Sequence, residues 1–145
     1  MKLLVVGSSK ANEEQAYDKI KQYFGNINEP FTVVNSGCKG IDKIAYLVAT
    51  DMGIPTELVT IKTLGLIVDG RSDLFKKIKI ANAEASRISD RAVSFALPYG
   101  TTIEKRGNAR PKCRYCKKAG LDYEHERSDG CKFAQQVKDF EIIVL

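Results

Sequence analysis

The chain has 145 residues, the size of one domain that can bury a hydrophobic core without disulfide bonds. Its composition, 43% hydrophobic and 28% charged with four prolines, excludes a disordered or fibrous protein. No apolar segment approaches the roughly 20 residues that cross a bilayer. The apolar N-terminal segment is also too short for a signal peptide. We therefore expect a cytoplasmic protein with no membrane partner. The net charge of +5 suits a nucleotide or nucleic acid, although lysines are also ordinary surface residues.

Two strand–turn–helix units open the chain. Residues 2–7 form an apolar run, and residues 12–24 then carry apolar side chains at helical spacing. The pattern repeats with a β-rich segment at 31–35, a turn of small residues at 36–40, and a helical face that runs from 41 to 53. Two βα units in succession predict a parallel sheet.

The next elements are less uniform. Residues 56–61 read as a third strand, and residues 62–71 as a loop or a short extra strand. Residues 72–89 have apolar side chains at three- and four-residue spacing, which predicts a third long helix with Ser72 as its N-cap. An apolar run at 91–97 predicts the fourth strand.

The last part of the chain is interrupted by a polar stretch. Residues 101–130 have no clear apolar period, whereas residues 131–138 fit a short helix and residues 140–145 a fifth strand. We therefore predict one α/β domain over residues 1–145, a Rossmann-like three-layer domain with a mainly parallel five-stranded sheet. Residues 108–131 form a small zinc-binding insert before the last helix and strand.

The insert is predicted from its cysteines and histidine. Three of the four cysteines and the only histidine lie within nineteen residues, in the pattern Cys113-x2-Cys116-x8-His125-x5-Cys131, while Cys38 stands apart. Four protein ligands leave no open position on a tetrahedral ion, so the pattern predicts a structural zinc site. The alternatives are free cysteines with a surface histidine, or a redox CxxC pair, which normally begins a helix directly after a strand.

Basic residues surround this cluster. They are Lys105, Arg106, Arg110, Lys112, Arg114, Lys117 and Lys118. They could contact nucleic acid as part of a zinc knuckle, or they could form a solvated surface.

Two turns of small residues are candidate anion sites. Parallel α/β sheets bind ligands at the carboxyl ends of their strands, where helix N-termini present free N–H groups. The turns are Gly7-Ser8-Ser9 and Ser36-Gly37-Cys38-Lys39-Gly40, and Lys39 adds a positive charge. Neither matches the Walker or the dinucleotide-binding pattern, and βα turns need glycine in any such fold.

Asp42, near the start of the next helix, either satisfies the helix dipole or accepts hydrogen bonds from a ligand hydroxyl.

Several of these segments together resemble the SLOG superfamily, which includes the LOG phosphoribohydrolases, DprA and YspA/YpsA-type proteins. The resemblance lies in Val5-Val6-Gly7-Ser8-Ser9, in Gly53-Ile54-Pro55, and in Ser36-Gly37-Cys38-Lys39-Gly40-Ile41-Asp42, which is similar to the family segment GG-A-x-G-x-D-x-x-A. Asn82 falls where the family often has an Arg-Asn or Arg-Lys pair. Phe95-Ala96-Leu97-Pro98 looks like the strand before the family's PGG-x-GT phosphate loop, which a cysteine–histidine ribbon interrupts in some members. Ser128-Asp129-Gly130-Cys131 looks like the part of that glycine-rich phosphate loop that follows the interruption.

The resemblance implies a nucleotide or nucleotide-derivative binding protein, expected to be a homodimer. The expected ligand-binding residues are Gly7, Ser8, Ser9, Ser36, Gly37, Lys39, Gly40, Asp42, Asn82, Ser128, Asp129 and Gly130. Because Cys131 is expected to be both the last zinc ligand and the first residue of the final helix, the zinc ion would hold residues 128–130 at the ligand cleft.

The chain departs from the family at two catalytic positions. Ala81 and Ala134 stand where LOG enzymes use an arginine and a glutamate, so phosphoribohydrolase activity does not carry over. Two alternatives to a pure binding function stay open. One is a hydrolase of nucleotide-derived substrates that uses Asp42, Asp69 or Asp129, although such carboxylates are also common in caps and turns. The other is nucleic-acid binding through the basic insert.

Overall fold

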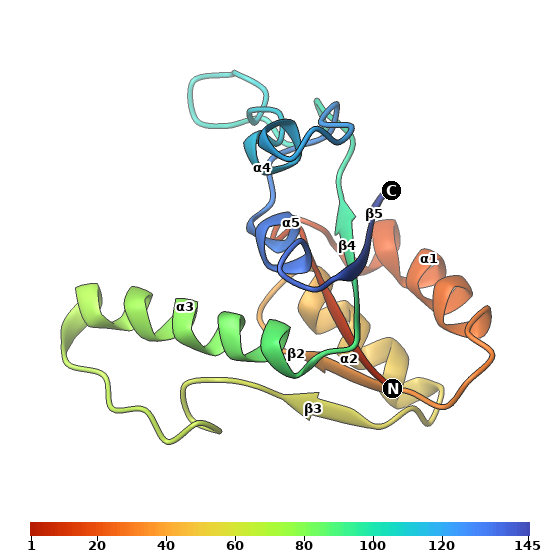
Figure 1. The fold of residues 1–145 in the computed structure, drawn as a ribbon. Coiled ribbons are helices and arrows are strands. Elements are labelled where there is room, and N and C mark those ends of the chain that lie inside the picture. Colours follow the sequence, from red (N-terminus) through yellow and green to blue (C-terminus); the bar gives the residue numbers. More distant parts are fainter.

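A five-stranded parallel sheet in the order β3-β2-β1-β4-β5 forms the centre of the computed structural model, which describes residues 1–145 (Figure 1). The strands are β1 (Lys2–Gly7), β2 (Thr32–Asn35), β3 (Thr56–Leu58), β4 (Arg91–Ala96) and β5 (Asp139–Val144). The helices are α1 (Glu13–Gly25), α2 (Ile41–Asp51), α3 (Gly70–Ile88), α4 (Arg114–Lys118) and α5 (Asp129–Ala134). All four neighbouring strand pairs are parallel, so the predicted Rossmann-like α/β fold is confirmed.

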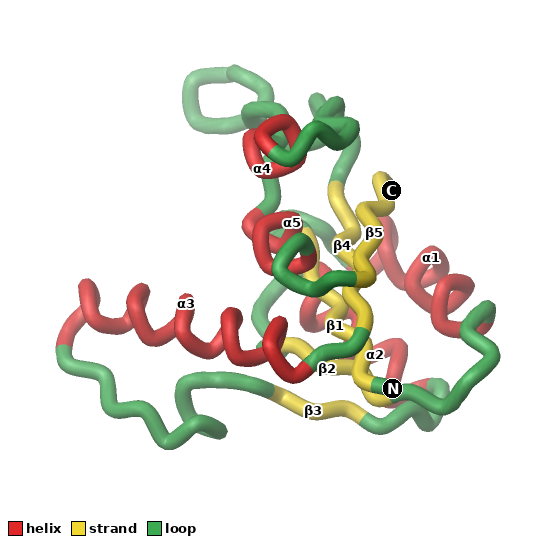
Figure 2. The backbone as a smooth tube through the Cα atoms, in the orientation of Figure 1, coloured by secondary structure: helices red, strands yellow, loops and turns green.

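Helices cover both faces of the sheet, which gives three layers (Figure 2). Side chains of β1 alternate between the two faces. Leu3 and Val5 pack in the cluster that contains residues of α1 and α2. Leu4 and Val6 pack in the cluster that contains residues of α3 and α5. Because β1 is buried on both faces from Leu3 to Val6, these four residues are all apolar.

The strand order changes direction beside β1, and this fixes where a ligand site can form. The chain runs from β1 outward to β2 and β3, and then returns to pair β4 with the other side of β1. In open parallel sheets, ligands bind outside the carboxyl ends of the strands at such a reversal. The turns after β1, β2 and β4 all leave this edge of the sheet.

Local sequence explains how α1 and α2 begin. Asn12 caps α1 by accepting a hydrogen bond from the N–H of Gln15 at 3.0 Å, and the Gln15 side chain accepts one from the N–H of Asn12. Gly40 precedes α2 with φ +84°, a conformation that favours glycine. A Cβ atom there would lie 2.3 Å from the carbonyl oxygen of Ser8, so glycine is also needed for close packing.

Two predicted boundaries in the middle of the chain are wrong. The third strand ends at Leu58 rather than at residue 61, because the Thr63 hydroxyl accepts a hydrogen bond from the N–H of Thr60 at 2.7 Å and turns the chain. The segment after it is a loop without an extra strand. The long helix begins at Gly70, so Ser72 lies inside α3 and is not its N-cap.

The predicted boundaries of the last helix and strand are also displaced. The final helix covers Asp129–Ala134 rather than residues 131–138, because the side chain of Ser128 caps it by accepting a hydrogen bond from the N–H of Gly130. Cys131 is therefore the third residue of α5 and not its first. The final strand is Asp139–Val144 rather than 140–145.

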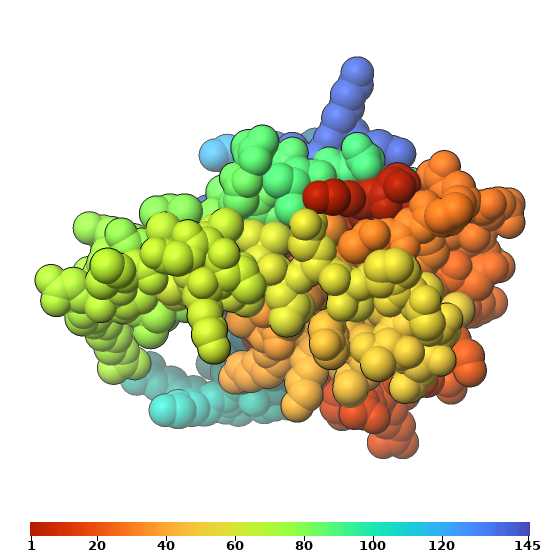
Figure 3. Space-filling view, turned by 90° about the horizontal axis from the view of Figure 1, so that it is seen from below, coloured from red at the N-terminus to blue at the C-terminus, as the bar shows by residue number.

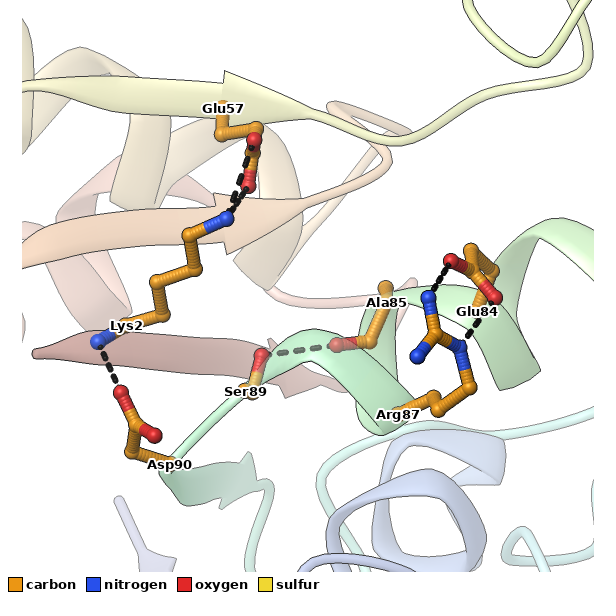
Figure 4. Close-up of polar contacts among 7 residues, drawn as sticks. All are labelled: Lys2, Glu57, Glu84, Ala85, Arg87, Ser89 and Asp90. Carbon is orange, nitrogen blue, oxygen red and sulfur yellow. Dashed lines mark hydrogen bonds and ion pairs between the residues drawn. The ribbon is translucent and has the colours of Figure 1, made fainter.

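Polar contacts hold the amino-terminal edge of the sheet, opposite the candidate sites (Figure 4). The N–H of Lys2 donates to the Asp90 carboxylate at 2.8 Å, which ties the start of β1 to the start of β4. The Lys2 ammonium pairs with Glu57 of β3 at 3.0 Å. The Ser89 hydroxyl donates to the carbonyl of Ala85 at 2.7 Å and closes the end of α3. Both side chains of the Lys2–Glu57 pair are partly exposed, so this pair adds little stability.

The first half of α3 and the loop before it project away from the sheet (Figure 1). We call residues 62–80 the α3 arm. The only buried residues of α3 are Ala81, Ala85 and Ser86, which lie beyond the arm. Six large apolar residues of the arm are exposed: Leu64, Ile67, Val68, Leu74, Phe75 and Ile80. None of the helices combines the length and the apolar character needed to cross a bilayer.

Candidate metal centre and ligand cleft

The four predicted metal ligands converge in the structure. The ligand atoms of Cys113, Cys116, His125 and Cys131 all lie within 4.8 Å of one another, and all four residues are buried. Zinc–sulfur bonds of about 2.3 Å in a tetrahedron separate two sulfurs by ~3.8 Å. The cluster therefore has the size and the closed ligand set that could hold one metal ion.

Short backbone pairings position these ligands. Cys113 immediately precedes α4, and its N–H donates to the carbonyl of His125 at 3.0 Å. Isolated antiparallel bridges join Pro98 to His125 and Lys112 to Glu126. The segment that carries His125 is thus held between the end of β4 and the approach to α4, with the histidine facing the cysteines.

The imidazole of His125 fits a metal ligand. Its Nδ1 lies 2.9 Å from the carbonyl oxygen of Glu126, and since a carbonyl can only accept, Nδ1 carries the proton. Its Nε2 is buried and has no hydrogen-bond partner. A buried nitrogen without a partner is unfavourable, whereas a histidine fixed through one nitrogen commonly binds a metal through the other.

The three thiols do not ionise independently. The hydrogen bond with Cys131 lowers the pKa of Cys113 to about 4, and the same bond raises the pKa of Cys131. Burial raises the pKa of Cys116 to about 11. The cluster thus favours a single negative charge, because a second thiolate beside the first is unfavourable. A cation would release the remaining protons, so metal binding should weaken as the pH falls.

The burial of these cysteines argues against the redox alternative. All three cysteines of the cluster are completely buried, whereas Cys38 is exposed. A redox pair needs a thiol that a partner can reach. The CxxC pair also follows the bridge at Lys112 rather than a strand of the sheet.

Helix α5 connects the metal cluster to the carboxyl edge of the sheet. A Cβ atom on Gly130 would lie 2.5 Å from the backbone nitrogen of Gly7, so α5 packs directly on the end of β1. The next residue, Cys131, faces the cluster. The helix that carries the last candidate metal ligand therefore also packs on the turn after β1.

The turns after β1 and β2 pack against each other. The N–H of Ile41 donates to the carbonyl of Ser8, and the N–H of Ser8 donates to the carbonyl of Phe95, each at 3.0 Å. The N–H groups of Ser9, Lys39 and Gly40 make no hydrogen bond within the protein. They are therefore free to donate to an anion.

Four of the twelve predicted ligand residues line two hollows beside the β2–α2 turn. A cavity of about 290 Å³ brings Ser36 and Asn82 together; its lining consists of Ser36, Cys38, Thr60, Ile61, Lys62, Ile78, Ala81 and Asn82. Gly37 and Lys39 line a second hollow together with Tyr46 and Leu58. Figure 3 shows a recess between the light-orange segment that includes this turn and the yellow-green α3 arm.

Asp42 lies beside the cavity. The Ser36 hydroxyl donates to its carboxylate at 2.9 Å. Burial raises the pKa of Asp42 to about 7, although the Ser36 hydrogen bond opposes this shift. A raised carboxyl pKa of this kind is common among functional carboxylates.

The three carboxylates of the hydrolase alternative have different surroundings. Asp129 accepts a hydrogen bond from the Tyr115 hydroxyl at 3.0 Å and faces α4. Asp69 immediately precedes α3, where its N–H donates to Asp73. No hydrogen bond connects either residue to Asp42. Neither Asp69 nor Asp129 lines the cavity beside Asp42.

Ion pairs neutralise part of the basic charge around the cluster. Lys112 pairs with Glu124 at 2.7 Å, and Arg110 pairs with Glu104 at 3.7 Å. Lys112 also lies over the ring of Tyr99. Two of the seven basic residues are therefore paired with acidic residues, which reduces the charge available to a nucleic acid.

Sequence reasoning missed three residues around the metal cluster. Glu126 is completely buried, and its carboxylate accepts a short hydrogen bond from the N–H of Thr102. Ser94 and Gln135 each contact a cysteine sulfur. Ser94 could have been noticed as the only polar residue in the apolar run from Ala92 to Leu97, but nothing in the sequence identifies the contacts of Glu126 and Gln135.

Comparisons with known proteins assign no family to the chain. No protein-family model, curated protein or solved structure matches the chain. The resemblance to the SLOG superfamily therefore stays a prediction.

Proposed function

We propose that this chain is a SLOG-type protein that binds a nucleotide or nucleotide derivative, and that a structural zinc ion holds its ligand cleft in shape. The packing of Gly130 on Gly7 is the observation that carries this proposal. Through that contact, one short helix joins the metal cluster to the turn where an anion would bind.

Zinc is the metal that best fits the ligand set. Three sulfurs and one imidazole nitrogen in a closed cluster are typical of structural zinc sites. Oxygen-preferring cations such as magnesium and calcium would find no carboxylate among the four ligands. Without an open position, the ion supplies structure rather than catalysis.

The chemistry of the cleft supports a nucleotide-type ligand. Free N–H groups of Ser9, Lys39 and Gly40 lie next to the start of α2, a combination that suits a phosphate. The neighbouring cavity offers an apolar wall from Ile61, Ile78 and Ala81 to the faces of a base or sugar. Asn82 and Ser36 can form hydrogen bonds with the polar edges of such a ligand.

A panel of nucleotides, cyclic nucleotides and ADP-ribose derivatives tests this proposal by thermal shift and calorimetry. We expect at least one to bind. Lys39→Ala should weaken that ligand about tenfold, or ~1.4 kcal/mol, because one charge-assisted contact to phosphate is lost. Lys21→Ala, which removes an exposed lysine from α1, is the matched control and should leave the affinity unchanged.

Two results would count against a nucleotide site at this position. One is that no compound of the panel stabilises the protein. The other is that Lys39→Ala and Lys21→Ala have equal effects. Mass spectrometry of the recovered ligand distinguishes a binding protein from the hydrolase alternative, in which Asp42 would be the first candidate for proton transfer.

The α3 arm supports the further proposal that two copies of the chain form a dimer. Ile67 is 85% exposed, Phe75 55% and Ile80 48%, whereas Lys62 and Ile78 of the arm line the cavity. Exposed apolar residues gathered in this way commonly mark an interface. A helix with little tertiary packing also gains stability from a second copy.

Phe75→Glu should convert the dimer to a monomer, because a charged side chain would be buried without a partner. Light scattering coupled to size-exclusion chromatography measures the mass directly. Ile103→Glu makes a similar chemical change at a 60% exposed residue before the insert and should leave the mass unchanged. A monomeric wild-type protein, or a Phe75→Glu variant that stays dimeric, would rule out pairing through the arm.

A further inference from the structure

Ser94 is a buried hydroxyl group in the middle of the sheet. It lies in β4, is 0% exposed, and has apolar neighbours on both sides in the sequence. Its Oγ lies 3.4 Å from the Sγ of Cys131, which is the only hydrogen-bond partner of this hydroxyl. A buried hydroxyl is unfavourable unless its partner is a good acceptor, and a thiolate is a better acceptor than a thiol.

Gln135 makes a similar contact on the other side of the cluster. It follows α5 directly, and its side-chain Nε2 lies 3.7 Å from the Sγ of Cys116. An amide nitrogen can only donate, so the sulfur is the acceptor. Two of the three sulfurs thus each have one polar side chain directed at them.

The charge of a filled cluster explains why such donors are needed. Three thiolates and a neutral imidazole around a divalent cation leave a net charge of −1 in a buried place. The side chains that contact these sulfurs by hydrogen bonds are those of Ser94 and Gln135, and no lysine or arginine donates to them. Hydrogen bonds to the sulfurs are then the remaining means of stabilising this charge.

We propose that Ser94 and Gln135 are positioning residues of the metal site, which donate hydrogen bonds to metal-bound Cys131 and Cys116 and so set the affinity for zinc. This inference rests on the proposed zinc site. The four ligands belong to the insert and α5, whereas Ser94 belongs to β4. A role for Ser94 therefore extends the metal site to the sheet. Partners of metal ligands that lie outside the coordination sphere typically change metal affinity by about 10- to 100-fold.

Two variants test the two contacts separately. Ser94→Ala removes the hydroxyl and leaves a small side chain that the core can accommodate. Gln135→Glu keeps the shape but replaces the donor with a negatively charged acceptor. Gln136→Glu introduces the same charge at the next, exposed residue and is the matched control. Zinc affinity is measured on the folded, full-length protein by competition with a chromophoric chelator.

We expect zinc affinity to fall about 10- to 100-fold in Ser94→Ala and at least as far in Gln135→Glu, with no change in Gln136→Glu. Cobalt(II) provides a second readout, because loss of a hydrogen bond to sulfur should move the sulfur-to-cobalt charge-transfer band to lower energy. A purely structural role would leave that band in place.

The possible failures can be told apart. If the wild-type protein binds no zinc, the proposed zinc site is wrong. If the wild-type protein binds zinc and a variant keeps both its affinity and its cobalt spectrum, that residue has no part in the site. An equal loss in Gln135→Glu and Gln136→Glu would show that only the added charge matters.

Discussion

Removing the metal ion is expected to unfold the insert and to lower the midpoint of thermal unfolding by more than about 10 °C. Between Pro98 and Arg127 only four residues are buried, and three of them are Cys113, Cys116 and His125. The insert therefore has almost no apolar core of its own. Structural zinc contributes about 10 to 16 kcal/mol in small zinc-dependent domains, and part of that free energy should stabilise this chain.

Scanning calorimetry before and after treatment with a zinc chelator measures this effect. Hydrogen exchange should show early opening of the insert and α5, with β1 and β4 still protected. Cys131→Ser should reproduce the loss, whereas Cys38→Ser removes an exposed cysteine outside the cluster and should not. An unchanged midpoint after metal removal, or equal losses in the two variants, would contradict a structural metal.

Gly130→Ala is expected to lower the free energy of unfolding by about 2 to 3 kcal/mol and to weaken nucleotide binding. The new Cβ would lie 2.5 Å from the nitrogen and 2.7 Å from the Cα of Gly7. Both are backbone atoms in the central strand, so no side-chain rotation can relieve the contact. Helix α5 would have to move away from the turn that is expected to bind phosphate.

Urea denaturation measures the stability of this variant, and calorimetry with the bound nucleotide measures its affinity. Gly25→Ala is the control, because a Cβ at that residue of α1 meets no atom within 4 Å. It should leave stability unchanged or raise it slightly. Equal stability of the two variants would mean that α5 does not pack on β1 as closely as described.

Much of the fold follows from local patterns in the sequence. The capping pair of Asn12 and Gln15 sets the start of α1, and the apolar run of β1 reflects burial on both faces of the sheet. Boundaries were missed where side chains bond across a turn. Thr63 ends the third strand early, and Ser128 starts the last helix two residues before Cys131. Such bonds depend on one or two atoms rather than on hydrophobic periodicity.

The candidate site was predictable only in part for a similar reason. The metal ligands follow from spacing, because a CxxC pair with a later His and Cys has a defined chemistry. The contact of Ser94 with Cys131 spans 37 residues in the sequence and exists only once the sheet and α5 are packed. Turn composition predicts the ligand residues, but it does not reveal that Ser36 and Lys39 line different hollows.

We expect one zinc ion to join the insert to α5 and so to the cleft. Elemental analysis combined with X-ray absorption at the zinc edge, on protein purified without added metal, tests it most directly. We expect one zinc per chain, with three sulfur ligands at about 2.3 Å and one nitrogen at about 2.0 to 2.1 Å. A metal-free folded protein, or a zinc ion bound mainly by oxygen, would contradict the account.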